Sequence, residues 1–410
     1  MASARTQLKE SMALTKKEVS NHIPRDISFL ILSKLPVKSL KRFTCVCKFW
    51  ANFFEKPQFM SMYLSKYDDH HNSRLLLKQT PSFFDYDDHD YLFLLLGETF
   101  ENSVKLDWPP PIDVDREGIL IAGSIVNGIL CLCQGNGRGD TTWIAQKVVL
   151  WNPSTEEFKV IPNGSFEHAI LKAFPPGTVF EDLPVINTIV NIHGFGYDPV
   201  SDDYKLIRCF CFFDNPEKRD PNDEILWQIY DLRSNCWRDL QVEMPSHLWT
   251  DMWQETGYAV YLQGMCHWWG YEDYFGDEVL VSFNLSNEVF ITTPFNHNYG
   301  RFAKHMVVLK ESIAMIEYQD SSCLYISILG EFGVADSWTR LLKIGPLPGV
   351  LEPIGVGKNG DIFYINYDEE VARFDLNAEV IEDMGVNGRH RCSQMVIYNE
   401  SLLPIGGMRG

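Results

Sequence analysis

Long hydrophobic runs are missing from this sequence, although hydrophobic residues make up 45% of its 410 positions. No stretch approaches the ~18 consecutive apolar residues that a membrane helix needs. The first twenty residues lack the apolar run of a secretory signal and carry four basic side chains, Arg5, Lys9, Lys16 and Lys17. We therefore expect no membrane partner and a location in the cytoplasm, the nucleus or both.

Metal-binding patterns are missing as well. The ten cysteines include three C-x-C pairs, Cys45/Cys47, Cys131/Cys133 and Cys209/Cys211. This spacing is too short for an easy disulfide, and a zinc site would need C-x-x-C pairs or histidines at matching spacing. Two acidic runs with histidine, at 68–71 and 85–90, are predicted to be solvated loops. We expect reduced, mostly buried cysteines, no metal and no cofactor.

Catalytic motifs are equally scarce. The segment Gly355-Val-Gly-Lys-Asn-Gly fits G-x-G-x-x-G, but a dinucleotide site needs a helix after the motif, and residues 361–366 predict a strand. We therefore predict a turn at 355–360. His193 and His267 each stand alone beside a predicted strand, which is typical of structural histidines. The sequence predicts no catalytic residue, so we expect a protein that is not an enzyme.

Basic residues are few after the first sixty-four positions. Residues 1–64 hold 11 Lys and Arg against 4 Asp and Glu, a net charge of +7, whereas residues 65–410 hold 25 against 51, a net charge of −26. An acidic field of this size repels phosphate and offers no counterion release, so nucleic acid is excluded as a partner. The acidity indicates either solubility alone or a preference for basic partners.

Residues 21–64 have the pattern of short helices, after a polar stretch at 1–20 that we predict to be disordered. Pro24 suits the first turn of a helix, and Pro36 ends this helix and can open the next. Apolar residues recur at helical spacing in both stretches: Ile27, Ile31 and Leu35, then Leu40, Phe43, Cys47 and Trp50. So short a segment cannot bury all its large apolar side chains by itself. They pack either on the rest of the chain or on a partner.

The motif in this segment resembles the F-box, especially its plant form. The similarity runs from Ile23-Pro-Arg-Asp-Ile through Leu35-Pro-Val-Lys-Ser-Leu to Cys45-Val-Cys-Lys-Phe-Trp50. It implies a helical trio that docks on a Skp-type adaptor, which links it to cullin and a RING subunit. It also implies which residues contact the adaptor: Pro24, Ile27, Ile31, Leu35, Pro36, Leu40, Val46 and Trp50. Ile23 stands where leucine is usual, and Leu30 where an acidic residue is common.

From about Ser73 onward the pattern changes to short β-branched and aromatic runs separated by turn residues. Five strand–turn–strand units recur at 148–162, 228–240, 281–294, 326–344 and 372–384. A period near ~50 with roughly four strands in each unit is typical of kelch-like propeller blades. A sixth blade could combine 74–108 with a C-terminal strand at 395–403. The predicted fold is therefore α+β and multidomain, with the helical segment at 21–64 and an all-β propeller of about six blades at 65–410.

Motifs within the repeats are similar to the plant F-box-associated interaction domain, including that of the S-locus F-box group. They include Asn127-Gly-Ile-Leu-Cys, Leu150-Trp-Asn-Pro-Ser-Thr, Gly194-Phe-Gly-Tyr-Asp-Pro, Asp202-Asp-Tyr-Lys, Asp336-Ser-Trp-Thr-Arg and Tyr398-Asn-Glu-Ser-Leu. The resemblance implies a domain that binds other proteins, and it does not identify the residues that bind the substrate.

Together the two resemblances imply the substrate-recognition subunit of a Skp–cullin–F-box ubiquitin ligase, which selects a protein for ubiquitination and degradation. Two alternatives stay open: a non-degradative scaffold bound to the adaptor, and a propeller that binds a ligand or sugar. One aromatic cluster could serve either core packing or an exposed binding surface: Trp249, Trp253, Trp268, Trp269 and Tyr271.

Overall fold

A computed structural model gives the structure of the chain. It describes residues 23–54, 59, 63, 74–80, 89–97, 100, 102–113, 118–135, 145–164, 187–213, 224–241, 249–250, 259–271, 278–295, 304–320, 323–347, 349–390 and 392–406. The predicted disordered stretch at 1–20 lies outside these residues. The chain separates into two compact units, 1–63 and 64–410.

Three short helices make up most of the described part of the first unit: α2 (Arg25–Ser33), α3 (Val37–Thr44) and α4 (Lys48–Phe54). Pro24 and Pro36 are the N-cap residues of α2 and α3. Pro24 therefore lies one position earlier than the predicted first turn, and Pro36 separates the two helices as predicted. Aromatic rings fill the interior, where Phe53 and Phe54 contact Phe59.

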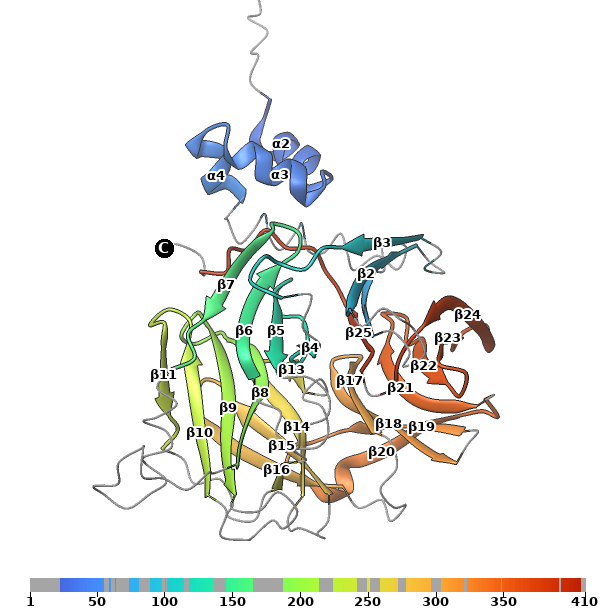
Figure 1. Cartoon of the computed structure of the whole chain (residues 1–410). Helices are drawn as coiled ribbons and strands as arrows, with labels where there is room; N and C mark the ends of the chain where they lie inside the picture. The colour runs from blue at the N-terminus through green and yellow to red at the C-terminus, as the bar shows by residue number, and fades with distance from the viewer. Residues whose placement is uncertain are drawn as a thin grey trace, which may run out of the picture. The chain divides into compact units, whose positions relative to one another are not determined.

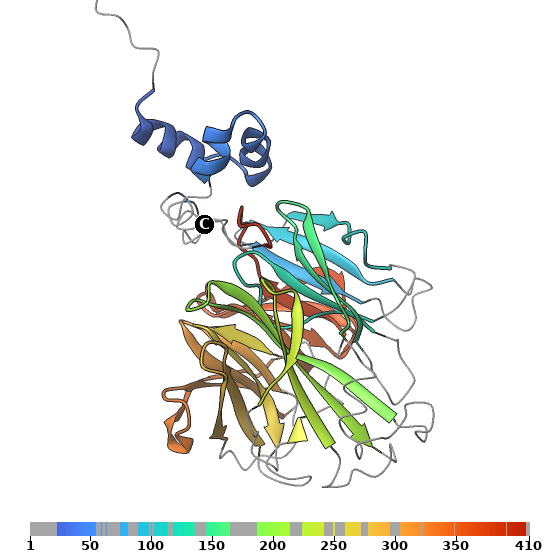
Figure 2. The same cartoon turned by 90° about the vertical axis from the view of Figure 1, so that its left-hand side faces the viewer.

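The second unit is a six-bladed β-propeller, as predicted. Figures 1 and 2 show its sheets arranged one after another around a common axis. Blade 1 contains β1 (Arg74–Gln79), β2 (Tyr91–Leu96), β3 (Asn102–Leu106) and β25 (Gln394–Ile397); blade 2 contains β4 (Ile119–Ile121), β5 (Leu130–Gly135), β6 (Ala145–Asn152) and β7 (Glu157–Ile161); blade 3 contains β8 (Asn187–Asp198), β9 (Asp203–Phe213), β10 (Glu224–Asp231) and β11 (Cys236–Asp239).

The other three blades continue in chain order. Blade 4 contains β12 (Trp249–Thr250), β13 (Val260–Leu262), β14 (Met265–Tyr271), β15 (Glu278–Asn284) and β16 (Val289–Pro294); blade 5 contains β17 (Lys304–Leu309), β18 (Ser312–Asp320), β19 (Cys323–Leu329) and β20 (Trp338–Ile344), with a short 3-10 helix η5 (Ala335–Ser337); blade 6 contains β21 (Val350–Val356), β22 (Ile362–Asn366), β23 (Glu370–Asp375) and β24 (Val380–Asn387). The five predicted strand–turn–strand units are the two outer strands of blades 2 to 6.

The ring closes through the C-terminal strand. β25 pairs antiparallel with β1, so that Leu75 lies opposite Ile397 and Leu77 opposite Met395. The chain therefore supplies blade 1 from both of its ends, which confirms the predicted sixth blade. This pairing removes an exposed strand edge that would otherwise invite aggregation.

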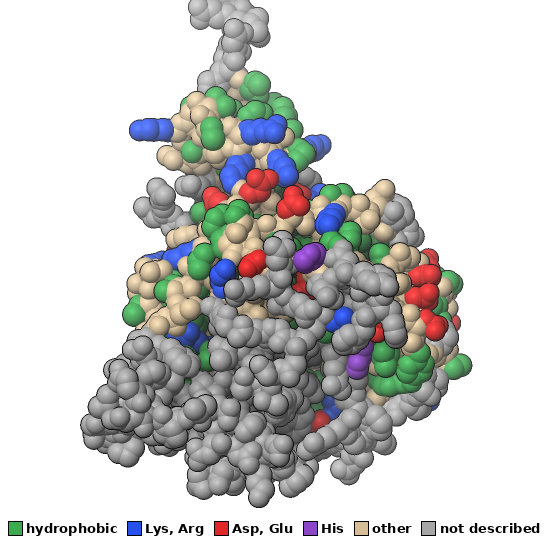
Figure 3. All heavy atoms as spheres, in the orientation of Figure 1, with side chains coloured by type: hydrophobic (Ala, Val, Ile, Leu, Met, Phe, Trp, Pro, Cys, Tyr) green, Lys and Arg blue, Asp and Glu red, His purple; other side chains and the backbone are tan. Residues whose placement is uncertain are grey.

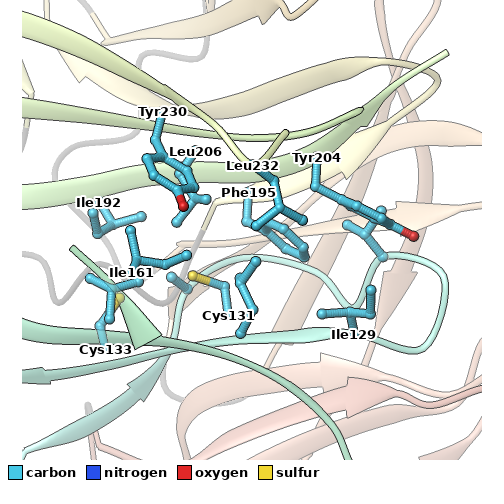
Figure 4. Packing of buried hydrophobic residues seen from close by; sticks show 14 of the residues in the cluster. Ile129, Cys131, Cys133, Ile161, Ile192, Phe195, Tyr204, Leu206, Tyr230 and Leu232 are labelled. Carbon is cyan, nitrogen blue, oxygen red and sulfur yellow. The ribbon is translucent and has the colours of Figure 1, made fainter. Parts of the chain in front are cut away.

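The hydrophobic core of the propeller lies between neighbouring blades. Figure 4 shows the layer between blades 2 and 3, where Cys131 and Cys133 of β5 face Leu206 of β9 and Tyr230 of β10. An equivalent cluster joins blade 6 to blade 1 through Phe363, Leu77 and Met395. Burial of apolar area at roughly 25 cal/mol per Å² makes these layers the main source of stability.

The predicted turn at 355–360 occurs in the second half of that segment: Gly355 and Val356 end strand β21, and the Gly360 amide then donates to the Gly357 carbonyl at 3.0 Å. Five of the described cysteines are buried, as predicted for most of them, whereas Cys45 and Cys47 are exposed where the chain turns between two helices. One local prediction needs correction. Asp90 is buried rather than solvated, and it accepts hydrogen bonds from the Thr80 hydroxyl at 2.5 Å and the Ile119 amide at 3.0 Å. The rest of the two acidic runs, except His89, lies outside the described residues.

Candidate functional site

The first unit exposes large apolar side chains along one stripe of α2. Ile27 and Ile31 are separated by four residues, which places them on the same side of a helix, and each is about half exposed. Ile23 and Leu30 extend this stripe. Exposing isoleucine side chains to water is unfavourable, so the stripe is suited to burial against another protein.

A second group of exposed apolar side chains lies where α3 ends and α4 begins. Val46 is 67% exposed, and Phe43 and Phe49 are also exposed. Trp50 is half-buried and stacks on Phe54, with ring centroids 5.8 Å apart. We define the docking set as the exposed apolar residues of both groups: Ile23, Ile27, Leu30, Ile31, Phe43, Val46 and Phe49.

The structure divides the eight predicted adaptor residues into three kinds. Pro24, Ile27, Ile31, Pro36 and Val46 are exposed, Leu35 and Trp50 are half-buried, and Leu40 is fully buried. Leu40 therefore packs inside the unit and supports the exposed residues, rather than lying on the surface of this conformation. Four members of the docking set were not predicted as contacts, namely Ile23, Leu30, Phe43 and Phe49. Their signal in the sequence is an excess of apolar residues beyond what so small a unit can bury.

Basic side chains accompany this apolar surface. Lys34, Lys38 and Arg42 are exposed on or beside the helices, and Lys48 begins α4. Figure 3 shows basic and hydrophobic side chains together on the visible side of this unit. Such a surface favours an acidic partner with an apolar centre, because opposite charges speed the encounter and apolar contact holds the complex.

The propeller offers little for catalysis in its described part. His193 is buried between Trp227 and Trp268, with its Nε2 atom 3.1 Å from the Cys209 sulfur. His267 places Nδ1 2.8 Å from the Ser282 hydroxyl. Burial lowers the pKa of each imidazole to about 3. Both are structural, and no cluster of three metal-ligating side chains occurs among the residues that the structure describes.

Several repeat motifs meet at the seam where the ring closes. Asn152 donates hydrogen bonds to the Ser401 and Leu403 carbonyl oxygens at 3.0 and 3.2 Å. The hydroxyls of Ser154 and Tyr398 are also hydrogen-bonded. The segments around Trp151 and Tyr398 are thus two sides of one contact between blade 2 and the C-terminus.

Another pair of motifs forms a buried ionic network between blades 3 and 4. The Lys205 ammonium lies 2.8 Å from an Asp198 carboxylate oxygen and donates to the Leu285 carbonyl at 2.8 Å. Burial alone would raise the pKa of the Asp198 carboxyl, but hydrogen bonds from Lys205, from the Ser201 and Ser286 hydroxyls and from the Val200 amide hold it well below the usual range. These motif residues therefore stabilise the contact between blades 3 and 4.

The predicted aromatic cluster serves as packing wherever it is described. Trp268 stacks on Trp227 with centroids 5.6 Å apart, and Trp269 makes an edge contact with Phe295. Trp253 and the side chains of Trp249 and Tyr271 lie outside the described residues. Within the described helices, none has the length and apolar character that crossing a membrane requires.

Comparison with known proteins agrees with this division. Residues 21–61 match the F-box domain, and residues 126–397 match the F-box associated beta propeller domain. A putative F-box protein of Arabidopsis thaliana is 25% identical over 279 residues, which is 67% of this chain and 61% of that protein. An F-box/kelch-repeat protein of the same species is 22% identical over 405 residues, covering 95% of this chain and 98% of the relative.

A third relative, F-box protein CPR1 of Arabidopsis thaliana, is 24% identical over 346 residues, or 78% of this chain and 73% of that protein. Among solved structures, a six-bladed fungal lectin of Aleuria aurantia is similar with a TM-score of 0.39, at 9% identity over 77% of this chain and 96% of that chain. That score is too low to support a conclusion about this chain. The two family matches cover both units, and the chain therefore belongs to the plant F-box proteins that carry an F-box-associated β-propeller.

Proposed function

We propose that this chain is the substrate-receptor subunit of a Skp–cullin–F-box ubiquitin ligase. Its first unit binds a Skp-type adaptor, and through it cullin and the RING subunit, while its propeller binds a protein that is then ubiquitinated. The observation that carries the proposal is the docking set, whose exposed isoleucines and Val46 belong to a unit that matches the F-box. The proposal includes action in the cytoplasm, the nucleus or both.

In this role the chain contributes proximity rather than bond chemistry. A receptor that holds its substrate beside a ubiquitin-loaded enzyme raises the effective concentration of the reacting groups. This role is supported by the two family matches, an F-box domain and an F-box associated beta propeller domain, since neither is an enzyme family. The narrower resemblance to the S-locus group stays a prediction, as do the two alternatives of a non-degradative scaffold and a ligand-binding propeller.

The test measures adaptor affinity for the full-length chain and for the double variant Ile31→Ala/Val46→Ala. Both side chains are more than half exposed, so their loss leaves the interior of the unit intact. Burying an Ile or Val contributes roughly 1.5–3 kcal/mol, so two losses weaken the adaptor complex by about a hundredfold or more. Val200→Ala is the matched control, because Val200 is 81% exposed but belongs to the propeller.

A reconstituted ligase then separates the competing functions. Ubiquitin transfer to a propeller-bound partner should fall with the double variant, while binding of that partner persists. Adaptor binding without cullin recruitment would support the scaffold instead. An unchanged adaptor affinity in the double variant would remove the proposal.

A further inference from the structure

The outer strands of blades 5 and 6 expose apolar side chains flanked by charges of opposite sign. On β20 the two apolar residues are Leu341 and Leu342, between Arg340 and Lys343, and all four are exposed. At β24 the exposed apolar residues are Val380 and Ile381, between Glu379 on one side and Glu382 and Asp383 on the other. Figure 3 shows acidic side chains gathered at the edge of blade 6.

The remaining outer strands do not have this composition. β7 carries both Glu157 and Lys159, and β11 carries both Arg238 and Asp239, so their charges are mixed. β3 has a single charge, on Lys105, and β16 has none. Among the six outer strands, only β20 has two basic side chains around a pair of exposed apolar residues, and only β24 is acidic and apolar.

We propose that these two edges are the two halves of a self-association interface, in which β20 of one copy contacts β24 of a second copy. When the two strands run in opposite directions, Arg340 lies opposite Glu382 and Lys343 lies opposite Glu379. Leu341 and Leu342 then lie opposite Ile381 and Val380. Two apolar contacts are thus flanked by two ion pairs. Contact between two β20 edges or two β24 edges would bring like charges together, so only the unlike pairing is favoured.

Contacts within each copy hold the charged groups in place. The Arg340 guanidinium lies over the Tyr325 ring at 4.6 Å, and Glu382 accepts a hydrogen bond from Arg373 at 2.8 Å. Their side chains nevertheless stay 33% and 38% exposed. Less side-chain entropy is therefore lost when a second copy binds.

A β-bulge determines the kind of contact. Arg340 pairs with Ser327 and Leu342 pairs with Ile326, which leaves Leu341 without a partner in the ladder. The bulge accompanies the exposure of two successive leucines, and it interrupts the hydrogen-bonding edge. The interface therefore forms through side chains rather than through one continuous sheet.

Because the two halves differ, each copy can bind two others. Such heterologous contacts form rings or open chains rather than a symmetric dimer. The contact is small, so each one is weak and association depends on concentration. Several receptors held together would bind a multivalent target more tightly than one copy does. This association is independent of the function proposed above.

Charge exchange in the full-length chain tests the proposal. The net charge of −19 repels copies of the chain from one another at long range. Added salt would weaken this repulsion and also the attraction between β20 and β24, so all measurements are made at physiological salt. Sedimentation velocity over a series of increasing protein concentrations should show a mean mass that rises with concentration, as a small and weak interface requires. Arg340→Glu/Lys343→Glu should lose this rise, and so should Glu379→Lys/Glu382→Lys.

An equimolar mixture of the two variants should regain the rise, because the acidic β20 of one faces the basic β24 of the other. Since Glu382 contacts Arg373, Glu379→Lys/Asp383→Lys serves as a second β24 variant that keeps Glu382. Lys105→Glu is the matched control and should associate like the unmodified chain. Lys105 belongs to the outer strand β3 and, like Arg340, lies over a tyrosine ring, 4.0 Å from the Tyr91 centroid. A single-chain mass throughout would refute the proposal, and so would folded variants whose mixture fails to associate.

Discussion

At the scale of single residues, burial decides what a side chain contributes, and neighbours in the sequence can differ completely. Ile31 and Leu40 were both predicted to contact the adaptor. Ile31 is 53% exposed and Leu40 is fully buried. Replacing either one should weaken adaptor binding, but for different reasons: Ile31 would lose a contact, and Leu40 would lose the packing that holds α3 in place.

Hydrogen exchange of the free chain distinguishes these reasons. Leu40→Ala should cost about 2–5 kcal/mol of stability, as is usual for a buried leucine, and should reduce amide protection throughout α2–α4. Ile31→Ala should leave that protection unchanged. Full protection in Leu40→Ala would mean that the interior position of Leu40 is wrong.

Buried histidines make stability depend on pH. The pKa of His193 is about 3 in the folded chain, against an ordinary value of 6.5. As pH falls below 6.5 the unfolded chain binds a proton at this residue and the folded chain does not, so stability falls by about 1.4 kcal/mol for each pH unit. Above pH 6.5 both states are neutral and the effect is absent.

Urea unfolding between pH 6.5 and 5 measures this slope. His193→Gln should reduce it by about 1.4 kcal/mol per pH unit, whatever its effect on absolute stability. His89→Gln, at an exposed position, is the control. An unchanged slope in His193→Gln would show that the imidazole is accessible to protons in the folded chain.

At the scale of elements, the Asn127-Gly128 turn and the C-terminal seam depend on each other. Both residues have positive φ, 52° and 78°, as a tight hairpin turn with this dipeptide requires. A Cβ at Gly128 would lie 2.5 Å from the Cβ of Ser401. The turn thus needs glycine for its own backbone and also for the close approach of the C-terminal segment.

Removing the closing strand should open the ring. A chain that ends at Ser393 loses β25 and the contacts of Ser401 and Leu403 with Asn152. Blade 1 would then expose the edge of β1, so we expect a lower melting temperature and aggregation. Light scattering during thermal melting checks this. A chain shortened by only residues 407–410 is the control, and unchanged melting of the longer truncation would contradict closure by β25.

At the scale of the whole molecule, the two units should behave as separate folding units. Each has its own core: the aromatic interior around Phe54 in the first, and the layers between blades in the second. Deleting residues 1–63 should abolish adaptor binding and leave the propeller with a cooperative transition at its original temperature. Calorimetry checks this, and a broadened or lost transition would show that the propeller depends on the helices.

The order of elements along the chain could be predicted because its signals are local. Pro36 separates two helices through its own ring geometry, and the repeated strand–turn–strand units each contain their own turn chemistry. The resemblance of its motif identified the helical segment as an F-box, and the count of repeats, with a ring to close, placed the last strand in the first blade. None of these predictions required knowing which side chains touch.

Which side chains are available to a partner was decided by the folded structure. Leu40 and Ile31 look equivalent in a helical pattern, but in the folded unit Leu40 is buried and Ile31 is exposed, and only the packing of the helices on one another makes that difference. Asp90 could not be separated from the acidic run before it, because its partners come from other segments of the chain, Thr80 just after β1 and Ile119 in β4. Likewise, opposite charges on β20 and β24 became an interface only once the propeller placed both strands at its rim. Contacts between residues far apart in the sequence depend on ring closure, and closure is a property of all six blades together.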